Sequence, residues 1–312
     1  MNSKVEAGKP LTTQPSITLA ELMRKFGDDE AACKTLLRDL RWPNGVKCPR
    51  CNRSEKVYEL KHKPFHWVCK NDDCGKRNGY RFSVITKTIF ENTNYPLHIW
   101  FQVIYLMTQS KKGISALQIH RQIGSGDYRT AWYMCQRIRA AMHDEEFPKL
   151  MGQVEVDETY LGGKDKNRHW NKKSGKSGLG SNKIPVIGAI SRKGNVVCKM
   201  IEHADARTLN GFVRNTVSDK VDLVATDEWK GYDYLQAQGY PHKTVTHSEG
   251  EYVRGQVHTQ NLDSFWSLLK RGIVGTYHKV SKKYLPLYLA EFQYRHNNRN
   301  NPNIFFDVIA GC

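Results

Sequence analysis

The chain has 312 residues, 39% of them hydrophobic, which is enough for two or three compact modules and excludes a wholly disordered chain. Lysine and arginine number 48 against 31 acidic residues, and the formal net charge of +17 favours a polyanionic partner such as nucleic acid. Because no run of about 18 apolar residues and no signal-peptide core occur, we expect no membrane span and a cytoplasmic or nucleoid location. Charge alone leaves a membrane-surface binder or a merely basic soluble protein as alternatives.

The N-terminal part predicts a polar tail followed by helices. Residues 1–15 are polar and are expected to form a disordered tail. Apolar residues at helical spacing over residues 17–40 predict two short helices, with a break at Gly27 and a new helix start at the two aspartates that follow. Residues 41–45 then interrupt the helical pattern and lead into a group of cysteines.

Four of the eight cysteines form two close pairs, a spacing typical of a zinc ribbon. They are Cys48, Cys51, Cys69 and Cys74. Four thiolates at this spacing can hold one tetrahedral Zn²⁺, and metal binding would supply the folding energy that such a short hairpin lacks. His62 and His66 lie nearby as alternatives to one thiolate. Basic residues around the pairs favour nucleic acid as the ribbon's partner, and a protein-binding ribbon is the alternative.

Residues 90–142 return to a helical pattern. One helix is expected from Pro96 to just before Gly113, a second over 114–122, and a third over 127–142 after a Gly-Ser-Gly turn. The last two have the form of a helix-turn-helix, whose second helix enters the major groove of DNA. Any small helical bundle would show similar spacing.

Three residues of the third helix are the candidates for DNA contact. Arg129 and Thr130 stand at the N-terminal end of the expected recognition helix, where side chains reach base edges. Arg137 lies two turns further along and is expected to hold a phosphate.

From Gly152 onward the pattern predicts strands that alternate with helices. Strands are expected at 154–160, 184–191, 196–202, 221–226 and 243–246, and helices at 206–217, 229–238, 260–271 and 281–298. Three antiparallel strands followed by strand–helix alternation predict an α/β fold with a mixed sheet.

The segment 162–183 is rich in lysine, arginine, glycine and serine and includes Lys172 and Lys173. It predicts a loop that grips phosphates and becomes ordered on DNA. The alternative is a solvated, flexible insertion without a ligand.

Two aspartates stand at the ends of predicted strands. Asp157 follows the apolar start of one strand and Asp227 directly follows another. Carboxylates on neighbouring strands can share two Mg²⁺ (or Mn²⁺) ions, which activate the attacking oxygen and stabilise the leaving oxygen in phosphodiester chemistry. Single acids at strand ends often only cap helices, and Glu158 and Glu228 flank the two candidates.

A third acid is expected from the helix predicted over 260–271. Asp263 lies within it, and Lys270 follows two turns later on the same helical face, where it would hold a DNA phosphate beside the metals.

The chain resembles the DDE transposases of bacterial insertion sequences, specifically the zinc-ribbon-bearing family numbered fifteen ninety-five, over roughly residues 18 to 300. The matching words outside the acidic region are residues 40–45, 48–51, 88–90, 112–117, 130–134 and 275–278. In the acidic region they are Val156-Asp157-Glu158-Thr159-Tyr160-Leu161-Gly162-Gly163, Thr226-Asp227-Glu228-Trp229 and Phe265-Trp266-Ser267-Leu268-Leu269-Lys270-Arg271-Gly272.

The resemblance implies an RNase H-like catalytic fold, divalent metal, and cleavage and strand transfer at terminal inverted repeats. It makes Asp157 and Asp227 the first two metal ligands and Lys270 the trailing base, with Arg271 beside it on the DNA. The third position is Asp263, where similar proteins carry Glu, or Asn261, since asparagine is also used there. The two lie about 200° apart around a helix, so only one of them can face the metals.

The resulting domain assignment is a disordered tail (1–15), a helical segment (16–43), a zinc ribbon (44–90), a helix-turn-helix region (91–148), an RNase H-like domain (149–299) and a C-terminal tail (300–312). The predicted function is a homo-oligomeric DNA transposase that binds terminal inverted repeats and target DNA. The alternatives are an inactive, transposase-derived DNA-binding protein, an RNase H-like nuclease acting on branched DNA, or a non-catalytic zinc-ribbon partner of transcription.

Overall fold

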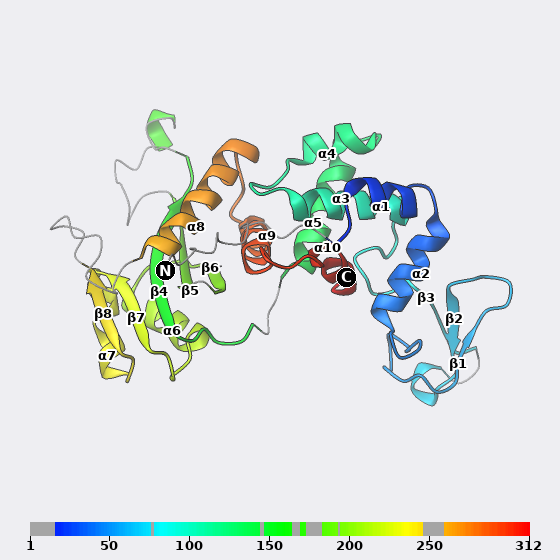
Figure 1. The fold of residues 1–312 in the computed structure, drawn as a ribbon, viewed down its shortest axis with the longest axis horizontal. Coiled ribbons are helices and arrows are strands. Elements are labelled where there is room, and N and C mark those ends of the chain that lie inside the picture. The colour runs from blue at the N-terminus through cyan, green and yellow to red at the C-terminus, as the bar shows by residue number, and fades with distance from the viewer. Residues whose placement is uncertain are drawn as a thin grey trace, which may run out of the picture. The chain divides into compact units, whose positions relative to one another are not determined.

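A computed structural model of the chain describes residues 16–75, 78–143, 147–163, 169–172, 183–192, 194–245 and 259–312. The chain divides into two compact units. The first comprises Met1–Ser110, Ala116–Met142 and Asn298–Cys312, and the second comprises Lys111–Ser115 and His143–Asn297. Figure 1 labels the helices and strands of both. None of the helices in the described ranges has the length and hydropathy needed to traverse a lipid bilayer.

The first unit is a helical bundle with a small sheet attached. Its helices are α1 (Leu19–Phe26), α2 (Glu30–Arg41), α3 (Leu97–Gln109), α4 (Ala116–Ile123), α5 (Tyr128–Ala141) and α10 (Ile304–Ala310). The two helices expected within 17–40 and the three expected within 96–142 are therefore confirmed. Residues 300–312, expected as a tail, instead contain α10, because the apolar side chains of Phe305 and Ile309 are buried.

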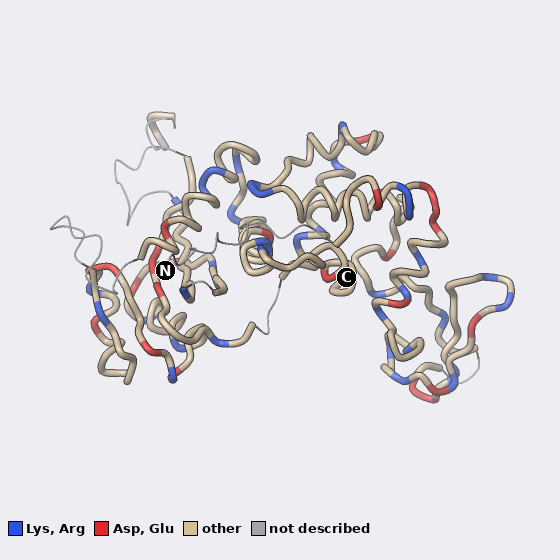
Figure 2. Tube along the Cα trace, viewed as in Figure 1, with Lys and Arg blue, Asp and Glu red and all other residues tan. Residues whose placement is uncertain are grey.

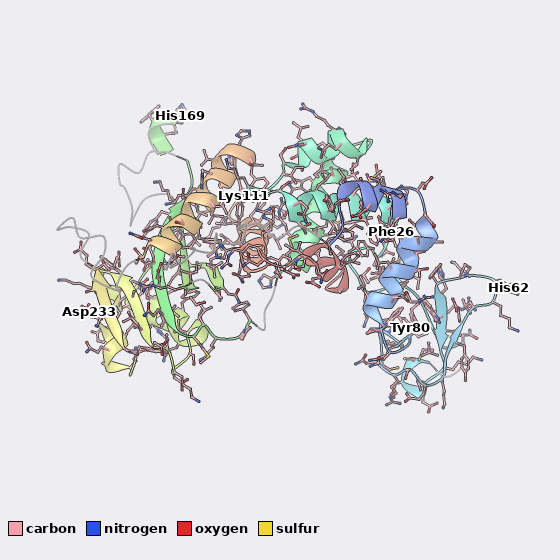
Figure 3. All side chains as sticks on the ribbon, in the orientation of Figure 1. Phe26, His62, Tyr80, Lys111, His169 and Asp233 are labelled. Atoms are coloured by element: carbon pink, nitrogen blue, oxygen red, sulfur yellow. The ribbon has the colours of Figure 1, made fainter. Side chains whose placement is uncertain are left out.

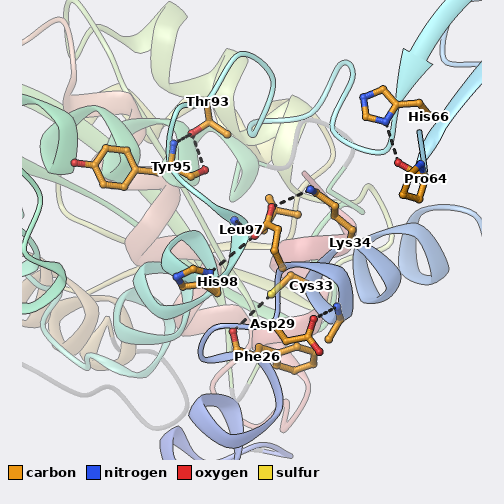
Figure 4. A network of polar contacts seen from close by, with 12 residues as sticks. Phe26, Asp29, Cys33, Lys34, Pro64, His66, Thr93, Tyr95, Leu97 and His98 are labelled. Carbon is orange, nitrogen blue, oxygen red and sulfur yellow. Dashed lines mark hydrogen bonds and ion pairs between the residues drawn. The ribbon is translucent and has the colours of Figure 1, made fainter. Parts of the chain in front are cut away.

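Local capping explains where α1 and α2 begin. Thr18 and Glu21 form a capping box at the start of α1. Asp29 accepts a hydrogen bond from the Ala32 backbone at the start of α2. Figure 4 labels Asp29 at this cap and Leu97 at the start of α3, whose backbone N–H donates to the carboxylate of Glu30. The first two contacts are local, whereas the bond between Glu30 and Leu97 joins two helices that are far apart in the sequence.

The small sheet consists of β1 (Val57–Glu59), β2 (His66–Cys69) and β3 (Tyr80–Ser83), paired antiparallel in the order β1-β2-β3. Its aromatic side chains form one cluster, in which the ring of Trp67 packs against those of Trp42 and Phe82. Figure 3 labels Tyr80 on β3, whose ring stacks on Phe82. Strands of three or four residues bury little surface, so the cluster alone leaves the sheet marginal.

The second unit contains a five-stranded mixed sheet. Its strands are β4 (Gln153–Leu161), β5 (Ile184–Ser191), β6 (Val196–Met200), β7 (Leu223–Asp227) and β8 (His242–Val245), in the order β6-β5-β4-β7-β8. β4, β5 and β6 are antiparallel neighbours, whereas β7 is parallel to β4 and β8 is parallel to β7. The predicted mixed α/β fold class is confirmed, and the architecture is that expected of an RNase H-like domain.

Helices cover both faces of this sheet. α8 (Gln260–Arg271) and α9 (Leu285–Asn297) contribute to one apolar core, and Figure 1 shows α8 running across β4 and β5. α6 (Ala206–Thr216) and α7 (Tyr234–Ala237) contribute to the other. Val154 and Val156 of β4 belong to the α6 side, so the alternate residues of β4 face α8. The alternation therefore presents Glu155 and Asp157 to α8.

Candidate functional site

Asp157 and Asp227 lie side by side at the ends of two adjacent strands. β4 and β7 run parallel with Glu155 opposite Ala225, and the same register brings Asp157 level with Asp227. Carboxylate oxygens of Asp157, Glu158 and Asp227 all lie within 4.8 Å of one another. The structure thus brings together the two strand-borne acids that the sequence predicts, and it adds Glu158 to them.

Glu158 was named in the sequence only as a neighbour that could be confused with Asp157. Consecutive strand residues point to opposite faces of a sheet, so Glu158 reaches the acidic group from the α6 side. The hydroxyl of Tyr232 donates a hydrogen bond to Glu158 Oε1 at 2.8 Å. Tyr232 is fully buried, so this bond fixes the carboxylate at the edge of the group.

The acids repel one another. Burial, together with repulsion from Asp227 and Asp263, raises the pKa of Asp157 to about 7. Burial likewise raises the pKa of Glu158 to about 7, against the opposing hydrogen bond from Tyr232. Partly buried carboxylate oxygens at these separations are the ligands that Mg²⁺ and Mn²⁺ prefer, and a cation would relieve the repulsion. The residues therefore fit a divalent metal.

The two candidates for the third position differ in what they contact. The side-chain amide of Asn261 donates to the carboxylate of Glu155 at 2.7 Å. Asp263 is exposed on the first turn of α8, accepts a hydrogen bond from the Thr259 hydroxyl, and is near enough to raise the pKa of Asp157. Asp263 nevertheless lies outside the group whose oxygens are within 4.8 Å. Of the two, Asp263 is the residue whose charge acts on the acidic group.

Trp266 of α8 orients the carboxylate of Asp157 from the α8 side of the sheet. Its indole Nε1 donates a hydrogen bond to Asp157 Oδ2 at 3.0 Å. The ring packs over Gly188, which is the cross-strand partner of Asp157 on β5. A Cβ at position 188 would lie 2.7 Å from both Cζ2 and Cη2 of the indole. Only glycine at this position leaves room for the ring that orients Asp157.

Replacing Gly188 with alanine is expected to lower the free energy of unfolding by about 1–3 kcal/mol, the usual effect of overpacking a core. The added methyl displaces Trp266 and loosens Asp157. Gly211→Ala is the matched control, because nothing lies within 4 Å of a Cβ there and alanine inside α6 stabilises the helix by up to about 1 kcal/mol. Urea unfolding measures both variants, and equal tolerance of the two substitutions would contradict the packing described.

The predicted phosphate-binding residues are described only in part. Lys270 and Arg271 are exposed in the last turn of α8. The acidic residues of β4 and the basic residues at the end of α8, coloured red and blue in Figure 2, belong to the same unit. Lys172 ends a short 3₁₀ turn that begins at Trp170, and its side chain lies outside the described part of the chain. Lys173 lies outside the described residues altogether.

The four clustered cysteines converge on one point. The Sγ atoms of Cys48 and Cys74 are 3.7 Å apart, and those of Cys51 and Cys69 are also 3.7 Å apart. A tetrahedron with Zn–S bonds of about 2.3 Å has edges of about 3.8 Å, so the thiols already stand at the separations that zinc requires.

The residues around the four cysteines differ in how they act on them. Although burial opposes the shift, hydrogen bonds from the backbone and side chain of Asn71 lower the pKa of Cys69 to about 7, which favours the thiolate. The ring of His66 instead contacts the Pro64 carbonyl oxygen (Figure 4). His62 lies on the loop between β1 and β2 (Figure 3). Among the described residues, the metal-ligating group consists of the four cysteines without either histidine.

The helix-turn-helix candidates are used differently from one another. The side chain of Asp127 caps the start of α5. In the first turn of this helix Arg129 is exposed and Thr130 is half-buried. The guanidinium of Arg137 instead donates to the carbonyl oxygens of Glu91 and Thr88. The hydrogen-bond donors of Arg137 are thus directed to backbone within its own unit, and its expected contact with a phosphate stays a prediction.

Both the acidic unit and the cysteine region are similar to domains of known proteins. The ISXO2-like transposase domain of IS1595 elements matches residues 149–297, and the transposase zinc-ribbon domain of the same elements matches residues 28–77. The chain is 30% identical over 279 residues to an uncharacterized protein in transposable element ISH50 of Halobacterium salinarum, covering 85% of this chain and 90% of the relative. It is 26% identical over 106 residues to an uncharacterized transposase-like protein of Haemophilus influenzae, covering 34% of this chain and 84% of that relative.

Proposed function

The chain belongs to the IS1595 family of transposases, and from that premise we propose that it cuts DNA at the ends of its element and joins the freed ends to target DNA. The observation that carries the proposal is the convergence of Asp157, Glu158 and Asp227 oxygens at the edge of the mixed sheet. A zinc-ribbon protein that only bound DNA would not need this group of mutually repelling acids.

In the first reaction, water attacks a phosphodiester, the P–O bond to the 3′ oxygen breaks, and the element end is left with a 3′-hydroxyl. In the second, this hydroxyl attacks a target phosphodiester, one P–O bond forms, and the target strand releases its own 3′-hydroxyl. When bound, two Mg²⁺ or Mn²⁺ ions would supply the Lewis acidity for both reactions.

The protein's own groups hold and orient the reactants. Asp157 and Asp227 would hold the ions, with Asp263 or Glu158 as the third acid. Trp266 and Tyr232 keep two of these carboxylates in place through their hydrogen bonds. The exposed cations of Lys270 and Arg271 would bind the DNA backbone along α8.

Incubation with the DNA that flanks this reading frame tests the proposal. We expect Mg²⁺- or Mn²⁺-dependent release of 3′-hydroxyl ends at terminal inverted repeats, followed by products joined to a target plasmid. Cleavage confined to branched junctions would instead identify a structure-specific nuclease. Binding without cleavage of any substrate would identify a transposase-derived DNA-binding protein.

The zinc ribbon and the α4–α5 pair are proposed to bind the repeats as double-stranded DNA. Because two element ends must be handled together, we also propose that the protein acts as a homo-oligomer. Its substrate places it with the cytoplasmic nucleoid.

Replacing Arg129 with alanine is expected to reduce discrimination between the repeat and scrambled DNA by about 1–3 kcal/mol, the contribution of one good base contact. Arg24→Ala, which removes an exposed arginine from α1 of the same unit, should leave discrimination unchanged. Fluorescence anisotropy at fixed salt concentration measures both.

Arg137→Ala should instead lower the stability of the protein, since the guanidinium of Arg137 donates hydrogen bonds to a backbone carbonyl oxygen. For Arg129, the contradicting result concerns affinity. Equal loss of affinity for repeat and scrambled DNA in Arg129→Ala would contradict a base contact.

A further inference from the structure

A second acid of β4, Glu155, connects this strand to the start of α8. Glu155 is fully buried. Its Oε2 accepts hydrogen bonds from the backbone N–H groups of Asn261 at 2.9 Å and Leu262 at 3.1 Å, and its Oε1 accepts from the Asn261 side chain at 2.7 Å. The guanidinium Nε of Arg192 lies 3.3 Å from the same oxygen.

These bonds replace a cap that α8 lacks in its own sequence. The first four N–H groups of a helix have no partner within the helix, and a side chain just before the helix usually accepts from one of them. Thr259 occupies that position and makes no such bond. Glu155 accepts two of these N–H groups instead, although it lies 106 residues earlier than Asn261. The positive end of the helix dipole further stabilises its charge.

The placement of this cap coincides with the acidic site. Glu155 and Asp157 lie two residues apart on β4 and face α8, whereas Asn261 and Asp263 lie two residues apart at the start of α8. Two hydrogen-bonded contacts thus fix the helix to the strand. One joins Glu155 to Asn261 in the first turn of α8, and the other joins Asp157 to Trp266 in the next turn. A buried carboxylate is costly unless it is hydrogen-bonded, and the start of α8 donates three hydrogen bonds to this one, with Arg192 donating another.

We propose that Glu155 is a positioning residue. By accepting hydrogen bonds from Asn261 it orients the first turn of α8, so that Asp263 is held near Asp157 and Asp227. The inference rests on the proposed metal-dependent function of the acidic group. It gives Asn261 the task of orienting α8 and leaves metal binding from this helix to Asp263.

Mn²⁺ binding to the zinc-loaded full chain tests this role without requiring DNA cleavage. Glu155→Gln keeps the size of the side chain and removes the charge that caps α8. We expect it to weaken Mn²⁺ binding about 10–100-fold, as is typical when the group that orients a metal ligand is changed. Asn261→Ala, a milder change at the same contact, should weaken binding in the same direction and guards against a Glu155→Gln protein that does not fold.

A double-mutant cycle distinguishes positioning from general stability. If Glu155 acts through Asp263, adding Glu155→Gln to Asp263→Asn should cause little further loss of Mn²⁺ affinity. Glu291→Gln is the matched control, because Glu291 is also fully buried in the second unit and bonded to Tyr277 and Arg295. It should lower the melting temperature and leave Mn²⁺ affinity unchanged.

Unchanged Mn²⁺ affinity in both Glu155→Gln and Asn261→Ala would overturn the inference, and so would additive losses in the cycle. If the wild-type protein bound no Mn²⁺, or if Asp157→Asn left its Mn²⁺ binding unchanged, the proposed metal site itself would be overturned. The two failures are therefore distinguishable.

Discussion

Asp157→Asn is expected to lower the rate of DNA cleavage by at least about a thousandfold, because loss of a metal ligand removes several kcal/mol of transition-state stabilisation and each 1.4 kcal/mol is about tenfold in rate. Binding of repeat DNA through the first unit should remain, since Asp157 lies in the second. Single-turnover cleavage of end-labelled repeat DNA in excess Mg²⁺ measures the rate, and anisotropy measures binding.

The same substitution should leave the metal-free protein at least as stable as the wild type. Burial and repulsion raise the pKa of Asp157, so at neutral pH its charged form opposes folding, and that opposition fades as pH falls below the raised pKa. Asparagine has no charge to bury. Asp222→Asn, an exposed aspartate just before the opposite end of β7, is the control and should leave cleavage unchanged. Substantial cleavage by Asp157→Asn, or equal effects of the two substitutions, would contradict the assigned role.

Removal of zinc is expected to unfold the ribbon. Binding of structural Zn²⁺ is worth about 10–16 kcal/mol in zinc-finger peptides, far more than strands of three or four residues obtain from packing. Cys48→Ser, or a strong chelator, should abolish the dispersed amide NMR signals of β1, β2 and β3 and greatly weaken DNA binding. The wild-type protein should contain one tightly bound zinc per chain by atomic absorption.

A different buried cysteine provides the control. Cys33 is fully buried in α2 with its Sγ 3.8 Å from the Phe26 carbonyl oxygen, and it is not a member of the group of four cysteines. Cys33→Ala should lower stability modestly and leave the zinc content unchanged. Four thiols that react freely in the native protein, or a ribbon that stays folded after chelation, would show that zinc does not hold this region together.

Much of the fold follows from local patterns. Period-two alternation places Val154 and Val156 in one core and leaves Asp157 on the other face, and an apolar run ending in Asp227 predicts β7 correctly. The cysteine spacing predicts the sulfur group because ligand geometry constrains the sequence between the pairs. α10 was missed because a helix of seven residues gives too short a periodic pattern. Asn303 stands at its N-cap position without a side-chain capping bond, and burial of its apolar side chains explains the helix.

The candidate site was predictable in outline and not in its contacts. The acid pair could be inferred because parallel strands end at the same edge of a sheet. Glu158 follows Asp157 just as Glu228 follows Asp227, and no local signal distinguishes the two glutamates. The place of Glu158 in the acidic group depends on a hydrogen bond from Tyr232, which lies 74 residues away in the sequence. Likewise, no sequence pattern shows that Asn261 turns to Glu155, or that Arg137 is occupied by the carbonyl oxygens of Glu91 and Thr88.

Two motifs without an obvious role in the sequence meet in the second unit. Gly113 has φ +82°, and a Cβ there would lie 1.9 Å from the hydroxyl oxygen of Tyr277. That hydroxyl donates to the buried carboxylate of Glu291 at 2.9 Å. Gly113 is therefore required both by its backbone conformation and by the close approach of Tyr277. The close approach of Gly113 and Tyr277 is a packing constraint that becomes visible only in three dimensions.

Anomalous diffraction from crystals soaked in Mn²⁺ tests the central claim most directly, with the zinc among the four cysteines as an internal reference. We expect a manganese peak within coordination distance of carboxylate oxygens from both Asp157 and Asp227. A clear zinc peak accompanied by no manganese at these two aspartates would contradict metal-dependent catalysis by this chain.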